Sequence, residues 1–395
     1  MTHIVVVGAS LAGVRVVEAL RNKGFEGRLT LIGDEDALPY DRPPLSKSVL
    51  TDAAPPVIPT FHDLDWYRAN NVELRLGERA LSLSRESREI ETVNGTVNFD
   101  QLIIATGARA RNPFLDAPAG VHTLRTFDDS QALRADIASG GHVVIIGGGF
   151  IGLEVAASAR SLGADVTVIE VAQMPLSRNL GVDVAPVIAQ TAVDHGVRLI
   201  CGRSVTELVG TPRIRQLVLD NGDRIDADTV VIGVGAVPNT EWLAGSGLTV
   251  SAAAVVCDGF GRAGDEIWAA GDVSAWADTD GISKRHEHWT SANEQAKVLA
   301  HNILEADEPR RVNAADYVWS DQFGRRINIV GDTRQYDGVR LASRNSESLA
   351  ALYSRDGILV GACVIGQARL MVKCRTWIAR GAATSEIPEW NIATA

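Results

Sequence analysis

Residues 3–13 read HIVVVGASLAG, a run of β-branched residues that leads directly into a turn rich in small residues. Residues 142–152 read HVVIIGGGFIG and repeat the same pattern. Each stretch continues into a helical pattern and then into another apolar run, at residues 14–32 and 153–169. A strand, a glycine turn, a helix and a second strand form the βαβ unit of a dinucleotide-binding domain. The two copies therefore predict two Rossmann-type domains.

The rest of the chain indicates an α/β fold class. Apolar runs that end near glycine predict buried strands at residues 102–108, 229–235 and 265–272. Beyond about residue 310 the pattern changes to alternating apolar and polar residues, which is typical of antiparallel strands. These runs lie at residues 326–330, 339–342 and 349–353, and a last helix is expected over 368–380. The sequence thus predicts two nucleotide-binding domains followed by an α+β C-terminal domain.

The composition, with 46% hydrophobic and 22% charged residues in 395, is that of an ordinary globular protein. The net charge of −11 argues against nucleic acid as the main ligand. No stretch of about 18 apolar residues is present, so no interaction with a membrane is expected. The first residues show no signal peptide, which makes a cytoplasmic location the default. The four cysteines have no zinc-ligand spacing, and His286 and His288 lack a third ligand, so no metal is expected.

In the first glycine turn, Gly8 would permit the tight turn and Gly13 the close packing of the following helix. Ser10 occupies the middle position, where a phosphate approaches the N-terminus of the helix. Asp34 follows the second strand and is placed to accept hydrogen bonds from ribose hydroxyls. A glycine-rich turn without a ligand is the alternative interpretation. The position of the turn at the start of the chain, together with Asp34, favours a nucleotide site.

The second turn fits the complete dinucleotide pattern, which here consists of Gly147, Gly149, Ile151 and Gly152. Glu170 ends the next predicted strand, where a carboxylate binds the ribose hydroxyls of NADH and repels the 2′-phosphate of NADPH. The three residues after Glu170 carry no positive charge, and Arg178 is the nearest cation. This turn therefore predicts an NADH site. The alternative is a solvated carboxylate at the end of a strand.

Two further strand ends carry small or acidic residues, at Thr106-Gly107 and at Gly271-Asp272. The Asp272 carboxylate is placed where it would bind the ribityl chain of a flavin. Taken alone, each of these segments is only a strand end followed by a turn. Combined with the first glycine turn, they predict a flavin-binding domain that is interrupted in the sequence by the NADH-binding domain.

A more specific signal lies outside the two turns. Residues 39–50 read PYDRPPLSKSVL, and residues 319–322 read WSDQ. With the glycine turns, these segments make the chain resemble the FAD-dependent NADH:ferredoxin reductases of Rieske oxygenase and bacterial haem-thiolate monooxygenase systems, the putidaredoxin reductase-like family. The resemblance covers nearly the whole chain and implies a glutathione-reductase-like fold. It implies an FAD-binding domain at residues 1–112 and 245–315, an NADH-binding domain at 113–244 and a C-terminal domain at 316–395.

The resemblance also implies roles for individual residues. Around FAD it places Leu11, Ala12, Asp34, Arg42, Lys47, Ala80, Arg125, Asp272 and Trp289, to which the motifs add Gly8, Ser10, Gly13, Thr106, Gly107 and Gly271. Trp289 stands where relatives often carry a smaller apolar residue, just before a helix expected over residues 291–304. Lys47 is expected beside the flavin ring and paired with Glu154. Phe150 is expected to shield the flavin, Gly235 to lie near the nicotinamide, and Trp319 to lie at the flavin edge that faces the ferredoxin.

NADH supplies two electrons as a hydride, whereas a [2Fe–2S] ferredoxin accepts one electron at a time. A flavin is able to divide the pair. Disulfide reductases of this fold use a cysteine pair after the first helix, but the first cysteine here is Cys201. Electrons must therefore leave the flavin directly, for a protein partner or for dioxygen. A rubredoxin reductase, an NADH oxidase and, in another class, an NADH-responsive flavin-binding signalling protein are the alternatives.

An acidic ferredoxin requires a basic docking face on a protein that is itself acidic. Residues 340–380 contain seven basic and only two acidic residues. Arg369 and Lys373 lie four residues apart on the expected last helix and so share one of its faces. Lys297 lies on the helix expected after Trp289. We expect these three residues to contribute to docking, and a solvated helix face is the alternative.

Overall fold

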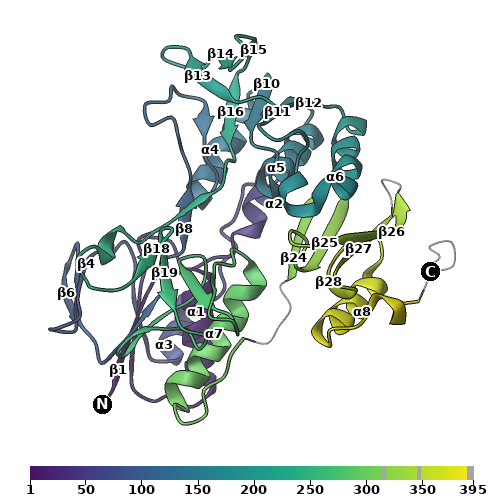
Figure 1. Ribbon diagram of the computed structural model, residues 1–395. Coiled ribbons are helices and arrows are strands. Elements are labelled where there is room, and N and C mark those ends of the chain that lie inside the picture. Colours follow the sequence, from purple (N-terminus) through teal and green to yellow (C-terminus); the bar gives the residue numbers. More distant parts are fainter. Residues whose placement is uncertain (313–316, 345–347, 389–395) are drawn as a thin grey trace. The chain divides into compact units, whose positions relative to one another are not determined.

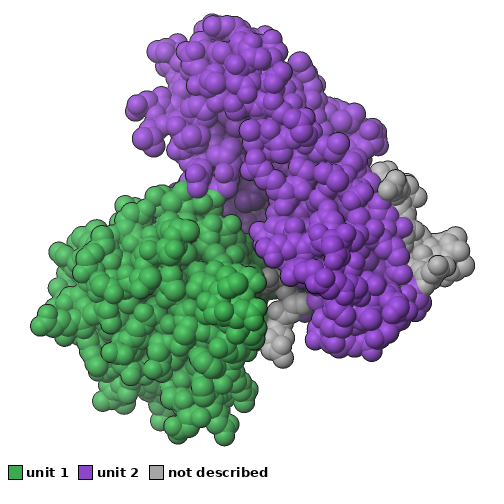
Figure 2. Space-filling model, viewed as in Figure 1, with its two compact units in different colours: residues 1–41, 58–109, 236–314 green, residues 42–57, 110–235, 315–395 purple. Residues whose placement is uncertain are grey.

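The computed structural model describes residues 1–312, 317–344 and 348–388. The chain divides into two compact units, which Figure 2 shows in different colours. Unit 1 contains residues 1–41, 58–109 and 236–314, and unit 2 contains residues 42–57, 110–235 and 315–395. Each unit contains a sheet with parallel strands, and one strand of each sheet is followed by a glycine turn. Unit 2 also contains an antiparallel C-terminal sheet (Figure 1).

Unit 1 is built on a six-stranded sheet in the order β20-β21-β7-β1-β2-β3, in which all neighbours are parallel except β20 and β21. Three smaller sheets have the orders β4-β5-β6, β18-β19-β22-β23 and β17-β8. The elements are β1 (His3–Val7), α1 (Leu11–Asn22), β2 (Arg28–Ile32), α3 (Leu64–Ala69), β3 (Val72–Arg75), β4 (Ala80–Ser84), β5 (Glu89–Thr92), β6 (Gly95–Asn98), β7 (Gln101–Ile104), β8 (Ala108–Ala110), β17 (Ala236–Pro238), β18 (Val250–Ser251), β19 (Ala254–Cys257), β20 (Arg262–Gly264), β21 (Ile267–Ala269), β22 (Ser274–Ala277), β23 (Ser283–Lys284) and α7 (Trp289–Leu304).

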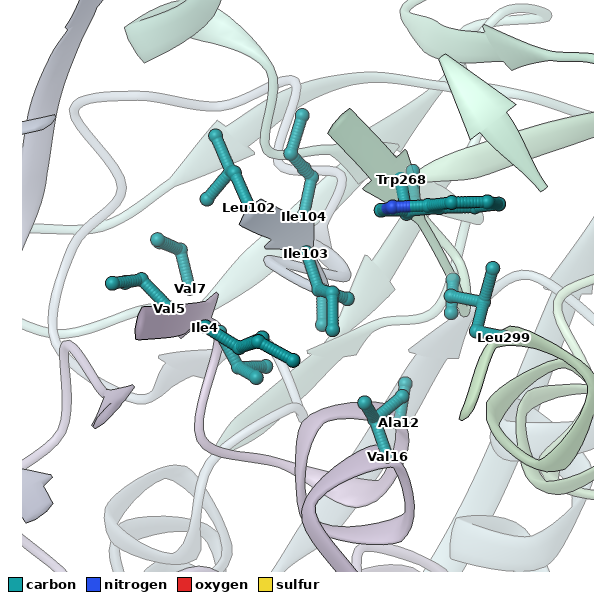
Figure 3. Close-up of a cluster of buried hydrophobic side chains, with 14 of the residues drawn as sticks. Ile4, Val5, Val7, Ala12, Val16, Leu102, Ile103, Ile104, Trp268 and Leu299 are labelled. Carbon is teal, nitrogen blue, oxygen red and sulfur yellow. The ribbon is translucent and has the colours of Figure 1, made fainter. Parts of the chain in front are cut away.

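The core of unit 1 follows from the apolar residues of β1 and its neighbours. Ile4 and Val5 point to opposite faces of the sheet, and both are fully buried because a parallel sheet is covered on both sides. In Figure 3, Ile4 and Ile103 point toward the helices that carry Val16 and Leu299. These helices, α1 and α7, pack side by side on that face of the sheet (Figure 1). The glycine turn after β1 is thereby held between a rigid strand and a packed helix.

Unit 2 contains a five-stranded sheet in the order β12-β11-β10-β16-β9, with all neighbours parallel. A three-stranded antiparallel sheet, β13-β14-β15, shares a hydrophobic core with it. The elements of this part are η1 (Pro43–Ser46), α2 (Ser48–Thr51), β9 (Val121–His122), α4 (Phe127–Ala138), β10 (His142–Ile146), α5 (Phe150–Ser161), β11 (Asp165–Glu170), α6 (Ser177–Asp194), β12 (Val197–Cys201), β13 (Val205–Val209), β14 (Gln216–Leu219), β15 (Arg224–Asp226) and β16 (Thr229–Ile232).

The C-terminal part of unit 2 is an antiparallel sheet in the order β24-β25-β28-β27-β26, with α8 packed against β25 and β28. Its elements are β24 (Tyr317–Gln322), β25 (Arg325–Gly331), β26 (Gly338–Arg344), β27 (Leu349–Arg355), β28 (Ile358–Ile365) and α8 (Ala368–Ala379). Leu153 of α5 and Leu180 of α6 share one buried cluster with Tyr353. The chain of α6 breaks at Gly181, and the Tyr353 hydroxyl donates to the Leu180 carbonyl beside this break (2.7 Å). The C-terminal sheet is therefore anchored to the second nucleotide sheet.

The observed fold confirms the predicted α/β class with two Rossmann-type sheets and a C-terminal antiparallel sheet. Three predicted strands end earlier than expected, at Ile104, Ile232 and Ala269. The glycines beyond these ends have positive φ angles, which a strand does not accommodate: Gly107, Gly235 and Gly271. The structure groups residues 42–57 and the C-terminal sheet with the second nucleotide sheet, and the finer division into three domains stays a prediction.

Candidate nucleotide-binding sites and the Glu154 cluster

The first glycine turn joins β1 to α1 and has no room for a side chain at its first and last positions. Gly8 has a φ of 120°, and a Cβ there would lie 2.0 Å from the carbonyl oxygen of Ala105. A Cβ at Gly13 would lie 2.0 Å from the carbonyl oxygen of Gly8. Ser10 precedes α1 in an extended conformation, and its side chain does not cap the helix. The first amide groups of α1 thus form an N-terminus of the kind that binds phosphate.

Segments that are far apart in the sequence meet at this turn. The backbone after β7 lies against Gly8. Gly271, which follows β21, lies against the first turn of α1, because a Cβ there would be 2.9 Å from the Cβ of Ala12. Asp272 is the next residue and is half-buried. Within unit 1, the structure therefore brings together three of the segments that the sequence associates with a flavin.

Other residues expected at FAD are held by contacts within their own units. In unit 1, the Thr106 hydroxyl donates to a backbone carbonyl (2.8 Å), and the Trp289 indole donates to Asp41 (2.9 Å). In unit 2, the Arg42 guanidinium donates to the carbonyl of Arg125. Because these residues belong to both units, their common role in one cofactor site stays a prediction.

Asp34, beyond the end of β2, has a partner that sequence reasoning missed. Its two carboxylate oxygens accept hydrogen bonds from the guanidinium group of Arg79, at 2.9 and 3.0 Å. The carboxylate raises the pKa of Arg79. Both side chains are exposed, so the pair adds little stability. Ala80, expected near the adenine, directly follows Arg79 at the start of β4.

The second glycine turn joins β10 to α5 under similar steric constraints. A Cβ at Gly147 would lie 2.3 Å from the carbonyl oxygen of Gly233, and one at Gly152 would lie 2.1 Å from the carbonyl oxygen of Gly147. Gly149 differs, because among the described residues no atom outside its own stretch of chain lies within 4 Å of a Cβ placed there. This open position at a helix N-terminus without a side-chain cap fits a pyrophosphate group. Gly235, two residues after Gly233, has a φ of 102°.

Glu170, at the end of β11, is fixed by the backbone of this turn. Its Oε2 accepts a hydrogen bond from the Gly148 amide and its Oε1 one from the Ala172 amide, each at 2.7 Å. A carboxylate oxygen accepts up to two hydrogen bonds, so each oxygen retains one acceptor position in these contacts. Ile151 is 46% exposed at the start of α5, and Arg178 is exposed on α6.

Glu154, in α5, is only 6% exposed and accepts four hydrogen bonds. Its Oε2 accepts from the Lys47 ammonium group at 2.7 Å and from the Ser46 hydroxyl at 2.5 Å. Its Oε1 accepts from the Ser320 hydroxyl at 2.7 Å and from the Asp321 amide at 3.3 Å. A buried carboxylate requires such partners, because its desolvation is otherwise very costly. The expected pairing of Lys47 with Glu154 is present, and its role at a flavin stays a prediction.

The strand β24 supplies part of this cluster. Sequence reasoning named Trp319 in this strand but missed its neighbour Ser320, whose side chain reaches Glu154. Successive residues of a strand point to opposite faces, and the Trp319 ring lies 6.0 Å from that of Tyr317. Phe150 lies one helical turn before Glu154 and packs against the buried cluster that α5 and α6 share with the C-terminal sheet.

The residues predicted to dock a ferredoxin belong to both units. Arg369 and Lys373 are exposed on α8 in unit 2. Lys297 lies on α7 in unit 1 and forms an exposed ion pair with Glu294 (2.8 Å). The structure thus places two of the three on one helix, and a common docking face for all three stays a prediction.

The four cysteines are all free thiols. Burial raises the pKa of both Cys363 and Cys374 to about 12, and burial with the charge of Glu170 raises that of Cys201. These shifts disfavour the reactive thiolate form. Among the described residues, no group of His, Cys, Asp and Glu is arranged to hold a metal ion. In that same part of the chain, no helix combines the length and apolar character that a membrane span requires.

Two Rossmann-type domains followed by a C-terminal domain with an antiparallel sheet are typical of a known class of oxidoreductase. Residues 2–296 match the family model of the pyridine nucleotide-disulphide oxidoreductases, and residues 317–387 match that of the reductase C-terminal domain. The chain belongs to the pyridine nucleotide-disulphide oxidoreductase family. Membership of this family implies binding of FAD and of a pyridine nucleotide.

Solved structures of similar proteins indicate which members of this family the chain resembles. The chain is 36% identical to Fdr9, with 97% of this chain and 96% of that chain covered and a TM-score of 0.89. It is 32% identical to the ferredoxin reductase for the CYP199A2 system from Rhodopseudomonas palustris, with the same coverage and a TM-score of 0.91. It is 28% identical to a chain of the covalent putidaredoxin reductase–putidaredoxin complex, with 96% and 93% covered and a TM-score of 0.91. These similarities confirm the resemblance to ferredoxin reductases.

Proposed function

We propose that this protein is an FAD-dependent NADH:ferredoxin oxidoreductase, which passes electrons one at a time to a [2Fe–2S] ferredoxin that serves an oxygenase. The similar reductases of the CYP199A2 and putidaredoxin systems support this proposal. The observation that carries it is the presence of two dinucleotide turns in a chain without a cysteine pair near the first of them. Because no thiol pair is available to take electrons from a flavin, the acceptor is a separate molecule.

Unit 1 has the features that FAD requires. The N-terminus of α1 has no side-chain cap, and the two glycines of the turn let strand and helix approach closely. Gly271 and Asp272 lie beside this helix N-terminus, where the Asp272 carboxylate would accept a hydrogen bond from a ribityl hydroxyl. When bound, FAD accepts a hydride equivalent and releases electrons singly. The protein contributes binding, orientation and charge to this chemistry.

Unit 2 has the features that NADH requires. The open position at Gly149 lies at the N-terminus of α5, which suits a pyrophosphate. The two remaining acceptor positions of Glu170 match the 2′- and 3′-hydroxyls of the adenosine ribose. The same negative charge disfavours a 2′-phosphate, so NADH is the proposed donor rather than NADPH.

We assign the reductive step to the Lys47–Glu154 pair. Lys47 supplies a positive charge that favours the reduced, negatively charged cofactor, and Glu154 holds the ammonium group in place. Phe150 is the proposed aromatic shield, and Trp319 is the proposed residue on the side of the acceptor. The exposed Arg369 and Lys373 on α8 are the proposed docking contacts for an acidic ferredoxin.

One experiment separates this proposal from the alternatives. The purified protein is loaded with FAD, reduced with NADH without oxygen, and then mixed in separate runs with an oxidised [2Fe–2S] ferredoxin, with oxidised rubredoxin or with dioxygen. Rapid reduction of the ferredoxin is expected. Transfer only to dioxygen would indicate an NADH oxidase, and transfer only to rubredoxin would indicate a rubredoxin reductase. A reduced flavin that transfers electrons to none of these acceptors would indicate a signalling protein.

A further inference from the structure

The hydroxyl of Ser320 belongs to a directed chain of buried hydrogen bonds that ends at the Glu154 carboxylate, which is also the ion-pair partner of Lys47. We infer that Ser320 is a positioning residue, which orients the Glu154 carboxylate and through it the Lys47 ammonium group for flavin reduction. This inference rests on the proposed function, because it gives Ser320 a part in the step in which NADH reduces the flavin.

The direction of the chain follows from the chemistry of its members. Ser320 is fully buried, and its hydroxyl donates to Glu154 Oε1 at 2.7 Å. A hydroxyl has one proton, and the carboxylate only accepts, so this proton is committed to Glu154. The contact between Ser320 and Gln322, at 2.9 Å, must therefore have the Gln322 amide nitrogen as donor. Both bonds point toward Glu154, and bonds aligned in this way reinforce each other in a medium of low dielectric constant.

The two carboxylate oxygens of Glu154 have different hydrogen-bond partners. The Ser320 hydroxyl and the Asp321 amide hold Oε1, whereas Lys47 and Ser46 bind Oε2. Fixing Oε1 sets the plane of the carboxylate and thereby the direction in which Oε2 faces the ammonium group. Without the Ser320 hydroxyl, the contact that Oε1 keeps within the described part of the chain is the longer one of 3.3 Å with the Asp321 amide. The carboxylate then rotates more freely, and Lys47 loses a fixed partner.

The other contacts of Lys47 do not replace this orientation. Its ammonium group also donates to the carbonyl of Pro43 at 3.1 Å and to the Ser46 hydroxyl at 3.4 Å. Both acceptors are uncharged and lie in the same short segment as Lys47. Glu154 is the ion-pair partner, and it comes from a different element, α5. The position of the positive charge relative to α5 therefore depends on how firmly Glu154 is held.

The test compares Ser320→Ala with Ser354→Ala in the FAD-loaded protein. Ser354 is a matched control, because it lies in the same sheet and, within the described residues, its hydroxyl donates to the Gly338 carbonyl (3.3 Å) and not to Glu154. Two quantities are measured: the rate constant of flavin reduction by NADH and the midpoint potential of the flavin. Ser320→Ala is expected to slow reduction about fivefold to tenfold. It is also expected to lower the midpoint potential, because the positive charge is less well placed, whereas Ser354→Ala changes neither quantity.

A double-mutant cycle separates a positioning role from a purely structural one. In a Glu154→Gln background, Ser320→Ala is expected to cause almost no further slowing, because its effect passes through Glu154. An equal slowing in both backgrounds would overturn the inference. If Ser320→Ala does not fold, Ser320→Cys replaces it, because cysteine has a similar volume and a weaker hydrogen-bond donor. Ser320→Cys is then expected to slow flavin reduction and to lower the midpoint potential by smaller amounts.

The outcomes for the two proposals are distinguishable. If NADH reduces the wild-type flavin but Ser320→Ala behaves like Ser354→Ala in both rate and potential, the inference fails and the proposed function stands. If the wild-type protein takes up no flavin, or if NADH does not reduce it, the proposed function fails and the inference fails with it.

Discussion

Replacing Glu170 with glutamine removes one hydrogen-bond acceptor and one negative charge from the proposed NADH site. The Gly148 and Ala172 amides each donate to a different oxygen of Glu170. Glutamine offers one oxygen, so one of these amides then faces an NH₂ group. The substitution also removes the charge that opposes a 2′-phosphate. A hydrogen bond to a charged group contributes about 1.5–3 kcal/mol, and water recovers part of this at a half-buried side chain.

We therefore expect Glu170→Gln to lower kcat/KM for NADH at least tenfold, about 1.4 kcal/mol. The value for NADPH should stay nearly constant, so the ratio of kcat/KM for NADH to that for NADPH also falls about tenfold. The assay is steady-state ferricyanide reduction with each nucleotide. The control is Glu207→Gln, which alters an exposed carboxylate on β13 in the same unit. Equal use of both nucleotides by the wild-type protein, or an unchanged ratio in Glu170→Gln, would refute the reasoning.

Lys47→Ala should slow flavin reduction by NADH at least tenfold in stopped-flow measurements, about 1.4 kcal/mol, and an unchanged rate would remove its catalytic role. Gly149→Ala should leave Tm unchanged, because the described residues beyond its own stretch of chain place no atom within 4 Å of the new Cβ. The substitution should nevertheless raise KM for NADH several-fold, and an unchanged KM would show that no pyrophosphate approaches there. Charge reversal at Arg369 and Lys373 should slow ferredoxin-dependent cytochrome c reduction but spare ferricyanide reduction, and equal effects on both assays would argue against docking at α8.

Local sequence was sufficient to predict the parts of the structure that depend on local sterics. Gly8 and Gly147 adopt positive φ angles, and a Cβ at either would collide with a carbonyl oxygen, so these positions leave a clear pattern in the sequence. The β-branched runs before them predicted the central strands correctly. The C-terminal antiparallel strands were predicted for the same reason, because alternation along a strand is also a local property.

Contacts between segments that are far apart in the chain leave no pattern in the sequence comparable to that of the glycine turns. Arg79 binds Asp34 across 45 residues, and nothing in either neighbourhood indicates the pairing. Ser320 and Glu154 are separated by 166 residues, and a single serine in a strand carries no signature of its own. The resemblance suggested Lys47 as the partner of Glu154, but the other three donors depend on how β24 and residues 42–57 pack against α5. Such contacts follow from tertiary structure alone.

The central claim is that electrons leave the flavin singly, for a separate protein and without a thiol relay. Anaerobic titration of the FAD-loaded protein with NADH, in the presence of excess oxidised [2Fe–2S] ferredoxin, tests this claim most directly. The account predicts that two ferredoxins are reduced for each NADH consumed and that the flavin is required. Consumption of NADH without reduced ferredoxin, or transfer in a protein that contains no flavin, would contradict it.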